Sequence, residues 1–386
     1  MEKIIRGDNM IIGVVGKIAA GKTTIAKFLE ENGFCRISCS DPLIDLLTHN
    51  VDAYSQIPEL PQKAEPTRDK LIEYGRYLKE TYGEDILIRL ALDKMRHCKD
   101  VVIDGVRSRG EIGAIKRRGG AIIYVEAKPE LRYERLVRRK AEKDKAINSF
   151  DDFKRMDDEE ERLYHTSKLK DLADFVIANE GTLGDLRKEV KKILEFLNTL
   201  VVIAPCLLSP FTVYRGPKEK EYRAASALMR FFGKYHYLKI LAYPCPEFIL
   251  LGFPRLPASK EVYEKLGMRE YAKKVAEFIV RSIGEEQPSR VILIGVKGSP
   301  TCGVFHTTSS DPEEYPYEKM EEFKKLSKKE RFKLAAEIAK DFKVIEGEGT
   351  LFELLKRKIE GIYLEFDKDN LEGSLRRIEK ALRDEL

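Results

Sequence analysis

Apolar runs alternate with helical patterns along the first half of the chain. Strand-like runs lie at 11–15, 34–38, 101–103, 121–126 and 174–178, and stretches of helical periodicity separate them. Alternation of this kind predicts a parallel sheet with helices on both faces and ligands at the carboxyl ends of the strands. We therefore expect the first half to be a three-layer α/β domain.

The same alternation returns in the second half. Strand candidates lie at 201–204, 238–242, 291–296, 343–345 and 361–366, and helical patterns lie at 219–233, 259–283, 329–341 and 350–358. An amphipathic stretch, 186–197, runs almost directly into the first of these strands. Because 386 residues exceed one ordinary core, we expect two domains, 1–199 and 200–386, the second with a Rossmann-like parallel sheet.

A phosphate loop occupies residues 16–24, which read Gly-Lys-Ile-Ala-Ala-Gly-Lys-Thr-Thr between the run 11–15 and a helical stretch. Glycines in such a loop let backbone N–H groups converge on a phosphate. Lys22 can then reach the β- and γ-phosphates, and the Thr23 hydroxyl can hold Mg²⁺. The residues predicted to bind ATP with Mg²⁺ are Gly16, Gly21, Lys22, Thr23 and Thr24.

Charged residues follow the next strands and predict an acceptor site. Asp41 can orient or deprotonate an acceptor hydroxyl or assist Mg²⁺, and Asp104 follows the strand 101–103. Arg68 and Arg107 can hold an acceptor phosphate. Arg135 begins a basic stretch that can fold over the phosphates as a lid. For any one arginine a surface ion pair is an equally good explanation. Together, after this loop, they indicate phosphoryl transfer.

At these residues the chain resembles the nucleoside monophosphate kinase-like group that includes dephospho-CoA kinase. The resemblance covers about 10–198 and rests on the phosphate loop, Ser40-Asp41-Pro42, the motif 103–107 and Ala173 to Asn179. It implies a kinase that phosphorylates a small phosphorylated acceptor, and it makes Asn179 a neighbour of the base or ribose. The stretch 43–90 matches no single member, so the acceptor stays open.

Three cysteines of the second half each follow a strand candidate: Cys206, Cys245 and Cys302. Because parallel strands share one carboxyl edge, the three thiols can meet there as a metal site. From spacing alone, small buried apolar residues explain them equally well. Six cysteines in a chain that we expect to be cytoplasmic suggest metal or redox chemistry more than disulfides. We expect Cys35 and Cys98 to be packing residues.

The sequence motifs around these cysteines look like the three motifs of thiouracil desulfurase-related proteins. They are Pro205-Cys206-Leu207-Leu208, Cys245-Pro246-Glu247 and the stretch 298–303. The resemblance spans about 200–367. It implies that the three cysteines hold a [4Fe-4S] cluster whose open iron takes sulfur from a thiolated pyrimidine or a thionucleotide such as thio-UMP. The glycine and second cysteine usual after the first motif are missing, as in a divergent branch, so the substrate stays open.

Three further residues are candidates at this second site. Glu247 can activate the water for desulfuration, although a helix-capping carboxylate explains it equally well. Ser299 can position substrate or water, and Lys297 can contact an anionic substrate or balance the cluster charge. A different class of function also fits the sequence, namely a regulatory P-loop NTPase fused to a structural metal or protein-binding module.

The composition of the chain limits the classes of molecule that it is expected to bind. Charged residues nearly balance at a formal net charge of +5, which suits small phosphorylated substrates such as nucleotides without requiring nucleic acid. No apolar run approaches the roughly 18 residues of a membrane helix, and the start of the chain lacks the apolar region of a signal peptide. We expect a bifunctional cytoplasmic enzyme that does not bind membranes, and the oligomeric state stays open.

Overall fold

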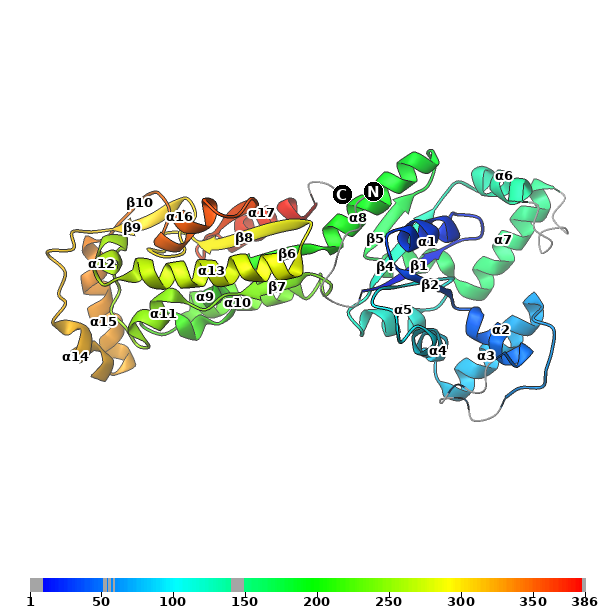
Figure 1. The fold of residues 1–386 in the computed structure, drawn as a ribbon, viewed down its shortest axis with the longest axis horizontal. Helices are drawn as coiled ribbons and strands as arrows, with labels where there is room; N and C mark the ends of the chain where they lie inside the picture. Colours follow the sequence, from blue (N-terminus) through cyan, green and yellow to red (C-terminus); the bar gives the residue numbers. More distant parts are fainter. Residues whose placement is uncertain (1–9, 51–53, 55–56, 58–59, 140–148, 384–386) are drawn as a thin grey trace. The chain divides into compact units, whose positions relative to one another are not determined.

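The computed structural model describes residues 10–50, 54, 57, 60–139 and 149–383. Their contacts form two compact units that divide between Leu194 and Glu195 (Figure 1). The division falls near the end of helix α8 (Leu183–Leu197), which ends two positions before strand β6 (Thr199–Ile203) begins. No helix among these residues is both long and apolar enough to cross a membrane.

The N-terminal unit is built on a five-stranded sheet in the order β2-β3-β1-β4-β5. Every pairing in it is parallel, as the sequence predicts. The strands are β1 (Ile11–Gly16), β2 (Cys35–Ser38), β3 (Val101–Asp104), β4 (Ala121–Glu126) and β5 (Phe175–Ala178). Because β1 lies in the middle, the phosphate loop leaves the sheet at its centre, with the carboxyl end of β3 beside it.

Helices cover both faces of this sheet. Val15 of β1 shares a core with Ile88 of α4 and Ile112 of α5. Its neighbour Val14 is fully buried on the opposite face, since side chains alternate along a strand. The expected three layers are confirmed. The helices are α1 (Lys22–Glu31), α2 (Asp41–Thr48), α3 (Arg68–Tyr82), α4 (Ile86–Lys94), α5 (Arg109–Lys116), α6 (Pro129–Arg139), α7 (Phe150–Tyr164) and α8.

The structure corrects the prediction for Cys35 and Cys98. They are not free packing residues but are joined by a disulfide across 63 positions of the chain. Cys35 opens β2, and its N–H donates to the carbonyl of Asp100, just ahead of β3. The pairing of β2 with β3 therefore brings the two thiols together, and this long-range register is what the separate sequence positions could not reveal.

The C-terminal unit is built on a four-stranded parallel sheet in the order β11-β8-β6-β7. Its strands are β6, β7 (Lys239–Ala242), β8 (Arg290–Val296) and β11 (Ile362–Phe366). The chain moves from β6 to one side and then returns to the other, so its crossovers lie on opposite faces. The strand order reverses between β6 and β8, which is where open α/β sheets bind ligands.

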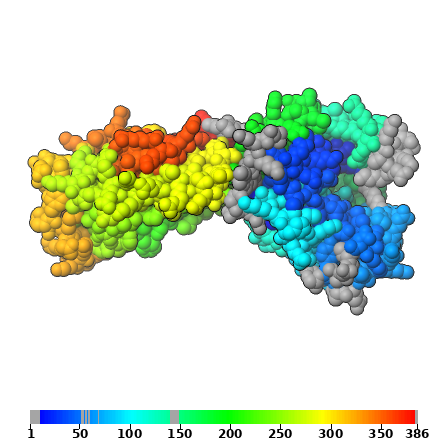
Figure 2. Space-filling view, in the orientation of Figure 1, coloured from blue at the N-terminus to red at the C-terminus, as the bar shows by residue number. Residues whose placement is uncertain are grey.

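The helices of this unit are α9 (Pro205–Leu208), α10 (Glu219–Phe232), α11 (Pro246–Leu251), α12 (Lys260–Lys265), α13 (Met268–Glu286), α14 (Lys319–Lys325), α15 (Lys328–Ile338), α16 (Thr350–Lys356) and α17 (Leu371–Arg383). The single helix predicted at 259–283 is wrong: Gly267, with φ 87°, separates α12 from α13. Helices α14 and α15 form one end of the unit's surface, gold in Figure 2.

The strand predicted at 343–345 exists but does not join the parallel sheet. It is β10 (Lys343–Glu346), which pairs antiparallel with β9 (His306–Ser309) in a separate ribbon. All its residues are exposed, whereas strands of a parallel sheet covered on both faces are buried. Its short apolar centre explains why the sequence pattern placed it with the buried strands.

Candidate active sites

A cavity of about 1670 Å³ opens at the carboxyl edge of the N-terminal sheet. Clefts for one small ligand measure roughly 300–1,000 Å³, so this cavity has room for two substrates. Its wall comes from the phosphate loop, the turns after β2 and β3, and parts of α3, α6 and α7. The predicted site residues that line it are Gly16, Gly21, Lys22, Thr23, Thr24, Asp104, Arg107, Arg135 and Asn179.

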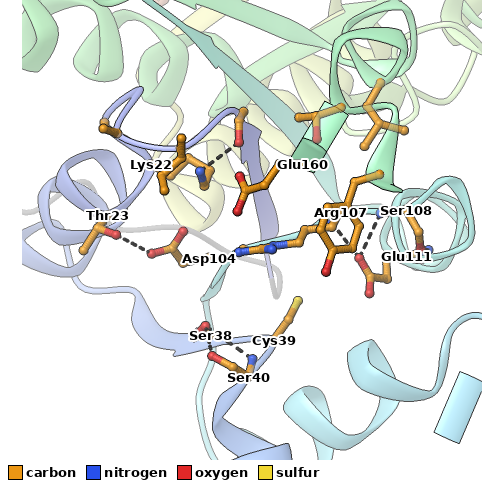
Figure 3. Close-up of a pocket in the computed structure, with 18 of the residues that line it drawn as sticks. Lys22, Thr23, Ser38, Cys39, Ser40, Asp104, Arg107, Ser108, Glu111 and Glu160 are labelled. Atoms are coloured by element: carbon orange, nitrogen blue, oxygen red, sulfur yellow. Dashed lines mark hydrogen bonds between the residues drawn. The ribbon is translucent and has the colours of Figure 1, made fainter. Parts of the chain in front are cut away.

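The phosphate loop holds Lys22 against its own backbone. The Lys22 ammonium donates to the carbonyl oxygens of Gly16 and Lys17, each at 2.8 Å (Figure 3). Burial, and then the nearby Arg107 guanidinium, lowers the pKa of Lys22 to about 8. A buried ammonium at the base of a glycine-bounded loop can exchange these carbonyls for phosphate oxygens.

Thr23 lies beside a buried carboxylate. Its hydroxyl donates to Oδ2 of Asp104 at 2.9 Å, and Asp104 is 6% exposed at the end of β3. Arg36 approaches the same oxygen at 4.0 Å. A loop hydroxyl paired with an aspartate on the adjacent strand is the arrangement that holds Mg²⁺ in P-loop NTPases. The sequence assigned Asp104 to the acceptor, whereas its contact is with the predicted magnesium ligand.

Arg135 and Asn179 close the other side of the loop. The Arg135 guanidinium donates to the Asn179 carbonyl at 2.9 Å, and the Asn179 amide donates to the carbonyl of Ala20 at 2.8 Å. A Cβ on Gly21, where φ is 114°, would lie 2.3 Å from the Asn179 amide nitrogen. Only glycine fits there, so α6, the end of β5 and the phosphate loop meet at one point.

One predicted acceptor residue, Asp41, is not among the described residues that line the cavity. Oδ2 of Asp41 accepts the N–H of Ser38 at 2.8 Å, which fixes the turn between β2 and α2. Arg68 begins α3, and its side chain lies outside the described residues. Cys39, a buried thiol two positions before Asp41, does line the cavity.

Sequence reasoning missed Glu111, which is 1% exposed and lines the cavity. Its carboxylate accepts the N–H groups of Arg107 and Ser108 at 2.6 and 3.1 Å, and it pairs with Lys79 of α3 at 2.8 Å. Ser108 and Glu111 form the capping box that starts α5. The Ser108–Glu111 capping pattern was visible in the sequence, but the ion pair of Glu111 with Lys79 of α3 was not.

A buried ion pair anchors α7 beside the phosphate loop, and no pattern in the sequence indicates it. Arg132 of α6 binds Asp157 through two hydrogen bonds of 2.6 and 2.7 Å. Lys17 of the loop lies 3.6 Å from Asp157 and 3.4 Å from Glu161. In the sequence, this acidic run resembles an ordinary solvated helix face.

The three predicted cysteines of the C-terminal unit sit around the point where its strand order reverses. Cys206 follows β6, Cys245 follows β7 at the start of α11, and Cys302 follows β8. Burial first, and then the thiols of Cys245 and Cys206, raises the pKa of Cys302 well above its usual range. The three thiols therefore lie within electrostatic reach of one another.

One side-chain hydroxyl and burial act on these thiols. The Tyr243 hydroxyl donates to Sγ of Cys302 at 3.3 Å, and burial raises the pKa of Cys245 to about 12. Neutral thiols of this kind ionise when they bind a metal. Within the described part of the chain, no group of three or more His, Cys, Asp or Glu has the geometry that holds a metal ion.

Glu247 is fixed by two partners that the sequence analysis did not identify. Its Oε2 accepts hydrogen bonds from Arg255 at 2.8 Å and from the Tyr263 hydroxyl at 3.3 Å. The Arg255 side chain is 3% exposed. The carboxylate is thus held in a buried ion pair two residues after Cys245, not on a solvated helix cap.

Ser299 and Lys297 flank Cys302 differently. The Ser299 hydroxyl accepts the N–H groups of Cys302 at 2.9 Å and Thr301 at 3.4 Å, so it shapes the loop that carries the thiol. Lys297 pairs with Asp367 at 3.0 Å, and its side chain is 45% exposed.

The strand order, the central phosphate loop and the Lys22 environment define the N-terminal unit as a P-loop kinase-like domain. Residues 12–165 match the family described as "AAA domain". A UPF0200 protein of Sulfurisphaera tokodaii is 30% identical over 186 residues, which are 48% of this chain and 96% of that protein. The chain therefore belongs to the UPF0200 family. A relative from Thermococcus kodakarensis is 28% identical over 194 residues, 97% of its length.

Residues 198–384 match the family described as "Putative 2-thiouracil desulfurase". This match confirms the resemblance inferred from the cysteine motifs. Among solved structures, a shikimate kinase from Acinetobacter baumannii has a TM-score of 0.31 at 19% identity and covers 48% of this chain and 93% of its own. A dephospho-CoA kinase from Campylobacter jejuni has a TM-score of 0.29 at 17% identity, covering 48% and 95%.

Proposed function

We propose that the N-terminal unit transfers the γ-phosphoryl group of ATP to a small phosphorylated acceptor. The observation that carries this proposal is one cavity lined by Lys22, the Thr23–Asp104 pair and the arginines Arg107 and Arg135. Lys22 binds the β- and γ-phosphates, and Thr23 with Asp104 holds Mg²⁺. The two arginines meet the charge that develops on the transferred group. A nucleotide switch would not need the acceptor side of the cavity.

The test is to incubate the full chain with ATP, Mg²⁺ and single acceptors drawn from the nucleoside monophosphates and dephospho-CoA. Phosphorylation of one acceptor, lost in Lys22→Ala and kept in Lys27→Ala, is the expected result. Lys27 is the matched control because it is exposed on the same helix. Slow hydrolysis of ATP with no acceptor turned over would instead support the regulatory NTPase.

We propose that the C-terminal unit desulfurates a thiolated pyrimidine or thionucleotide with the help of a [4Fe-4S] cluster held by Cys206, Cys245 and Cys302. The donor set supports this, because three free cysteines, Cys302 buried and Cys206 and Cys245 partly buried, follow three strands of the same parallel sheet, and thiolates are the ligands of such clusters. When bound, a cluster with three protein ligands supplies an iron that can accept a thiocarbonyl sulfur.

The residues around the thiols have distinct roles in this proposal. Ser299 fixes the loop of Cys302, and Tyr243 donates a hydrogen bond to its sulfur. Arg255 and Tyr263 orient the Glu247 carboxylate, whose other oxygen then receives the proton of the attacking water. Lys297, partly exposed, contacts the anionic part of the substrate.

Anaerobic purification with iron and sulfide analysis tests the cluster. We expect an absorption band near ~400 nm and about four irons per chain, lost in Cys302→Ser and kept in Cys39→Ser. Cys39 is the control because it is a free buried cysteine of the other unit. Protein that stays free of iron after anaerobic reconstitution would contradict the proposal.

A further inference from the structure

We infer that Tyr164 is a positioning residue that holds the Arg107 guanidinium beside the transferred phosphoryl group. The inference rests on the proposed kinase function, in which Arg107 meets the charge that develops on that group. Tyr164 is the last residue of α7, is half-buried, and lines the N-terminal cavity. Its ring centroid lies 5.1 Å from the central carbon of the Arg107 guanidinium. An aromatic face attracts a cation at this distance.

The position of Arg107 in the cavity is the first support. Figure 3 shows its side chain reaching from the turn after β3 toward Asp104. Arg107 and Asp104 both act on the charge of Lys22, which agrees with that view. Since Lys22 marks the place of the β- and γ-phosphates, the guanidinium lies within electrostatic reach of the group that is transferred.

The backbone of Arg107 is fixed separately from its side chain. Its N–H donates to the Glu111 carboxylate at 2.6 Å, which holds the turn after β3. An arginine side chain has several rotatable bonds, so a hydrogen bond to its backbone leaves the guanidinium free to occupy many positions. The contact with the Tyr164 ring acts on the guanidinium itself. It therefore favours the rotamers that keep the charge in the cavity.

Helix α7 gives the ring a fixed support. Seven positions before Tyr164, on the same helix face, Asp157 binds Arg132 through two hydrogen bonds, and Lys17 of the phosphate loop lies 3.6 Å from Asp157. Directly after Tyr164, His165 takes the left-handed conformation, with φ 47°, and ends the helix. The ring is therefore carried by a helix that is tied to the phosphate loop.

The end of α7 also favours a cation. The last carbonyl groups of a helix have no partners within it and carry partial negative charge. Because Tyr164 closes α7, a guanidinium over its ring lies beside this last turn. At the other end of the same helix, the Phe153 ring lies 5.2 Å from the Arg132 guanidinium. Helix α7 thus orients two arginines, Arg132 for stability and Arg107 for the transferred group.

Variants of Tyr164 test the inference. Tyr164→Leu removes the aromatic face, and Tyr164→Phe removes only the hydroxyl. With ATP–Mg²⁺ and the best acceptor of the wild type, we expect Tyr164→Leu to lower kcat/KM for the acceptor by about 3- to 30-fold. The KM for ATP should change little, and Tyr164→Phe should match the wild type. Tyr77→Leu is the matched control, because Tyr77 is 52% exposed and is not among the described residues that line the cavity.

A double-mutant cycle distinguishes positioning of Arg107 from general packing. Arg107→Gln removes the guanidinium, so Tyr164→Leu should cause little further loss when it is added to that variant. Tyr164→Gln repeats the cycle with a polar side chain, so that the result does not depend on the folding of one variant.

Two results overturn the inference while the kinase proposal stands, given an active wild type. One is an equal loss from Tyr164→Leu with and without the Arg107 guanidinium. The other is wild-type kcat/KM in both Tyr164→Leu and Tyr164→Gln. A wild type that phosphorylates no acceptor overturns the kinase proposal and the inference together.

Discussion

Single buried charges set the chemistry of the N-terminal cavity. Lys22 shows this most directly, because burial and Arg107 lower the pKa of its ammonium to about 8. The β- and γ-phosphates favour the charged form, so bound ATP should raise that pKa again. The site is therefore cationic at neutral pH and loses charge as the pH rises past 8.

This behaviour predicts proton uptake on nucleotide binding. Near pH 8.5 we expect ATP to bind with uptake of a large fraction of one proton, and the affinity for ATP to fall as the pH rises further. Calorimetry in buffers of different ionisation enthalpy measures the uptake. Lys22→Arg is the control, since a guanidinium stays charged and should take up none. Equal heats in all buffers for the wild type would contradict the prediction.

Residues whose place in the fold follows from a local pattern were predictable at this scale. Gly16, Gly21, Lys22 and Thr23 follow from loop chemistry, and the three strand-end cysteines follow from the rule that parallel strands share an edge. The partners of the predicted site residues were not predictable, as Glu247 shows. Arg255 lies eight positions from Glu247 in an unremarkable stretch, and only the folded loops bring their side chains to 2.8 Å.

At the scale of elements, α7 depends on the Arg132–Asp157 pair. Burial opposes the charge of Asp157, but the Arg132 hydrogen bonds outweigh burial and lower its pKa. A lowered carboxyl pKa contributes stability above the unfolded-state value, about 3.9, and that contribution is lost as the pH falls through the folded-state value. The pair should therefore stabilise the unit at neutral pH, and this stabilisation should be lost in acid.

Asp157→Asn should lower the free energy of unfolding by roughly 3–5 kcal/mol at neutral pH, because it leaves the Arg132 guanidinium buried without a carboxylate. Urea unfolding of the full chain, monitored at pH 7 and again below pH 4, measures the loss. Asp158→Asn, exposed on the same helix, should change little. A loss that stays the same in acid would argue against the ion pair as its cause.

The Cys35–Cys98 disulfide ties β2 to the segment ahead of β3. Closing a loop of 63 positions stabilises a fold by about 4 kcal/mol in the chain-entropy treatment. Reductant should lower the melting temperature of the wild type, and Cys35→Ser should lower it without reductant. The double variant Cys35→Ser, Cys98→Ser should match the single one, and a wild type insensitive to reductant would contradict the linkage.

The elements themselves were largely foreseen, and the errors have local causes. Long buried runs such as β1 and β8 were identified because strands covered on both faces are continuously apolar. The segment 343–346 pairs with β9, which has a polar sequence that no periodicity marks. Gly267 ended a helix that the apolar pattern alone would continue.

At the scale of the whole molecule, the two families in one chain suggest linked chemistry. Desulfuration of thio-UMP would yield a nucleoside monophosphate, the kind of acceptor that kinases resembling the first unit use. We expect the N-terminal site to phosphorylate a pyrimidine nucleoside monophosphate when single acceptors are compared in steady-state assays. Turnover of dephospho-CoA with no pyrimidine nucleotide phosphorylated would break this link and leave the two activities unrelated.

Glu111 links two parts of the wall of the N-terminal cavity, the turn after β3 and helix α3. One oxygen holds the backbone at Arg107 and Ser108, and the other holds Lys79 of α3. If α3 moves inward, there are two outcomes. Either the Arg107 turn moves with it, or the ion pair of Lys79 with the Glu111 carboxylate, which is 1% exposed, is broken. The second course is costly. The helix α3 and the Arg107 turn should therefore move together, so that a ligand which draws in one of them should also draw in the other.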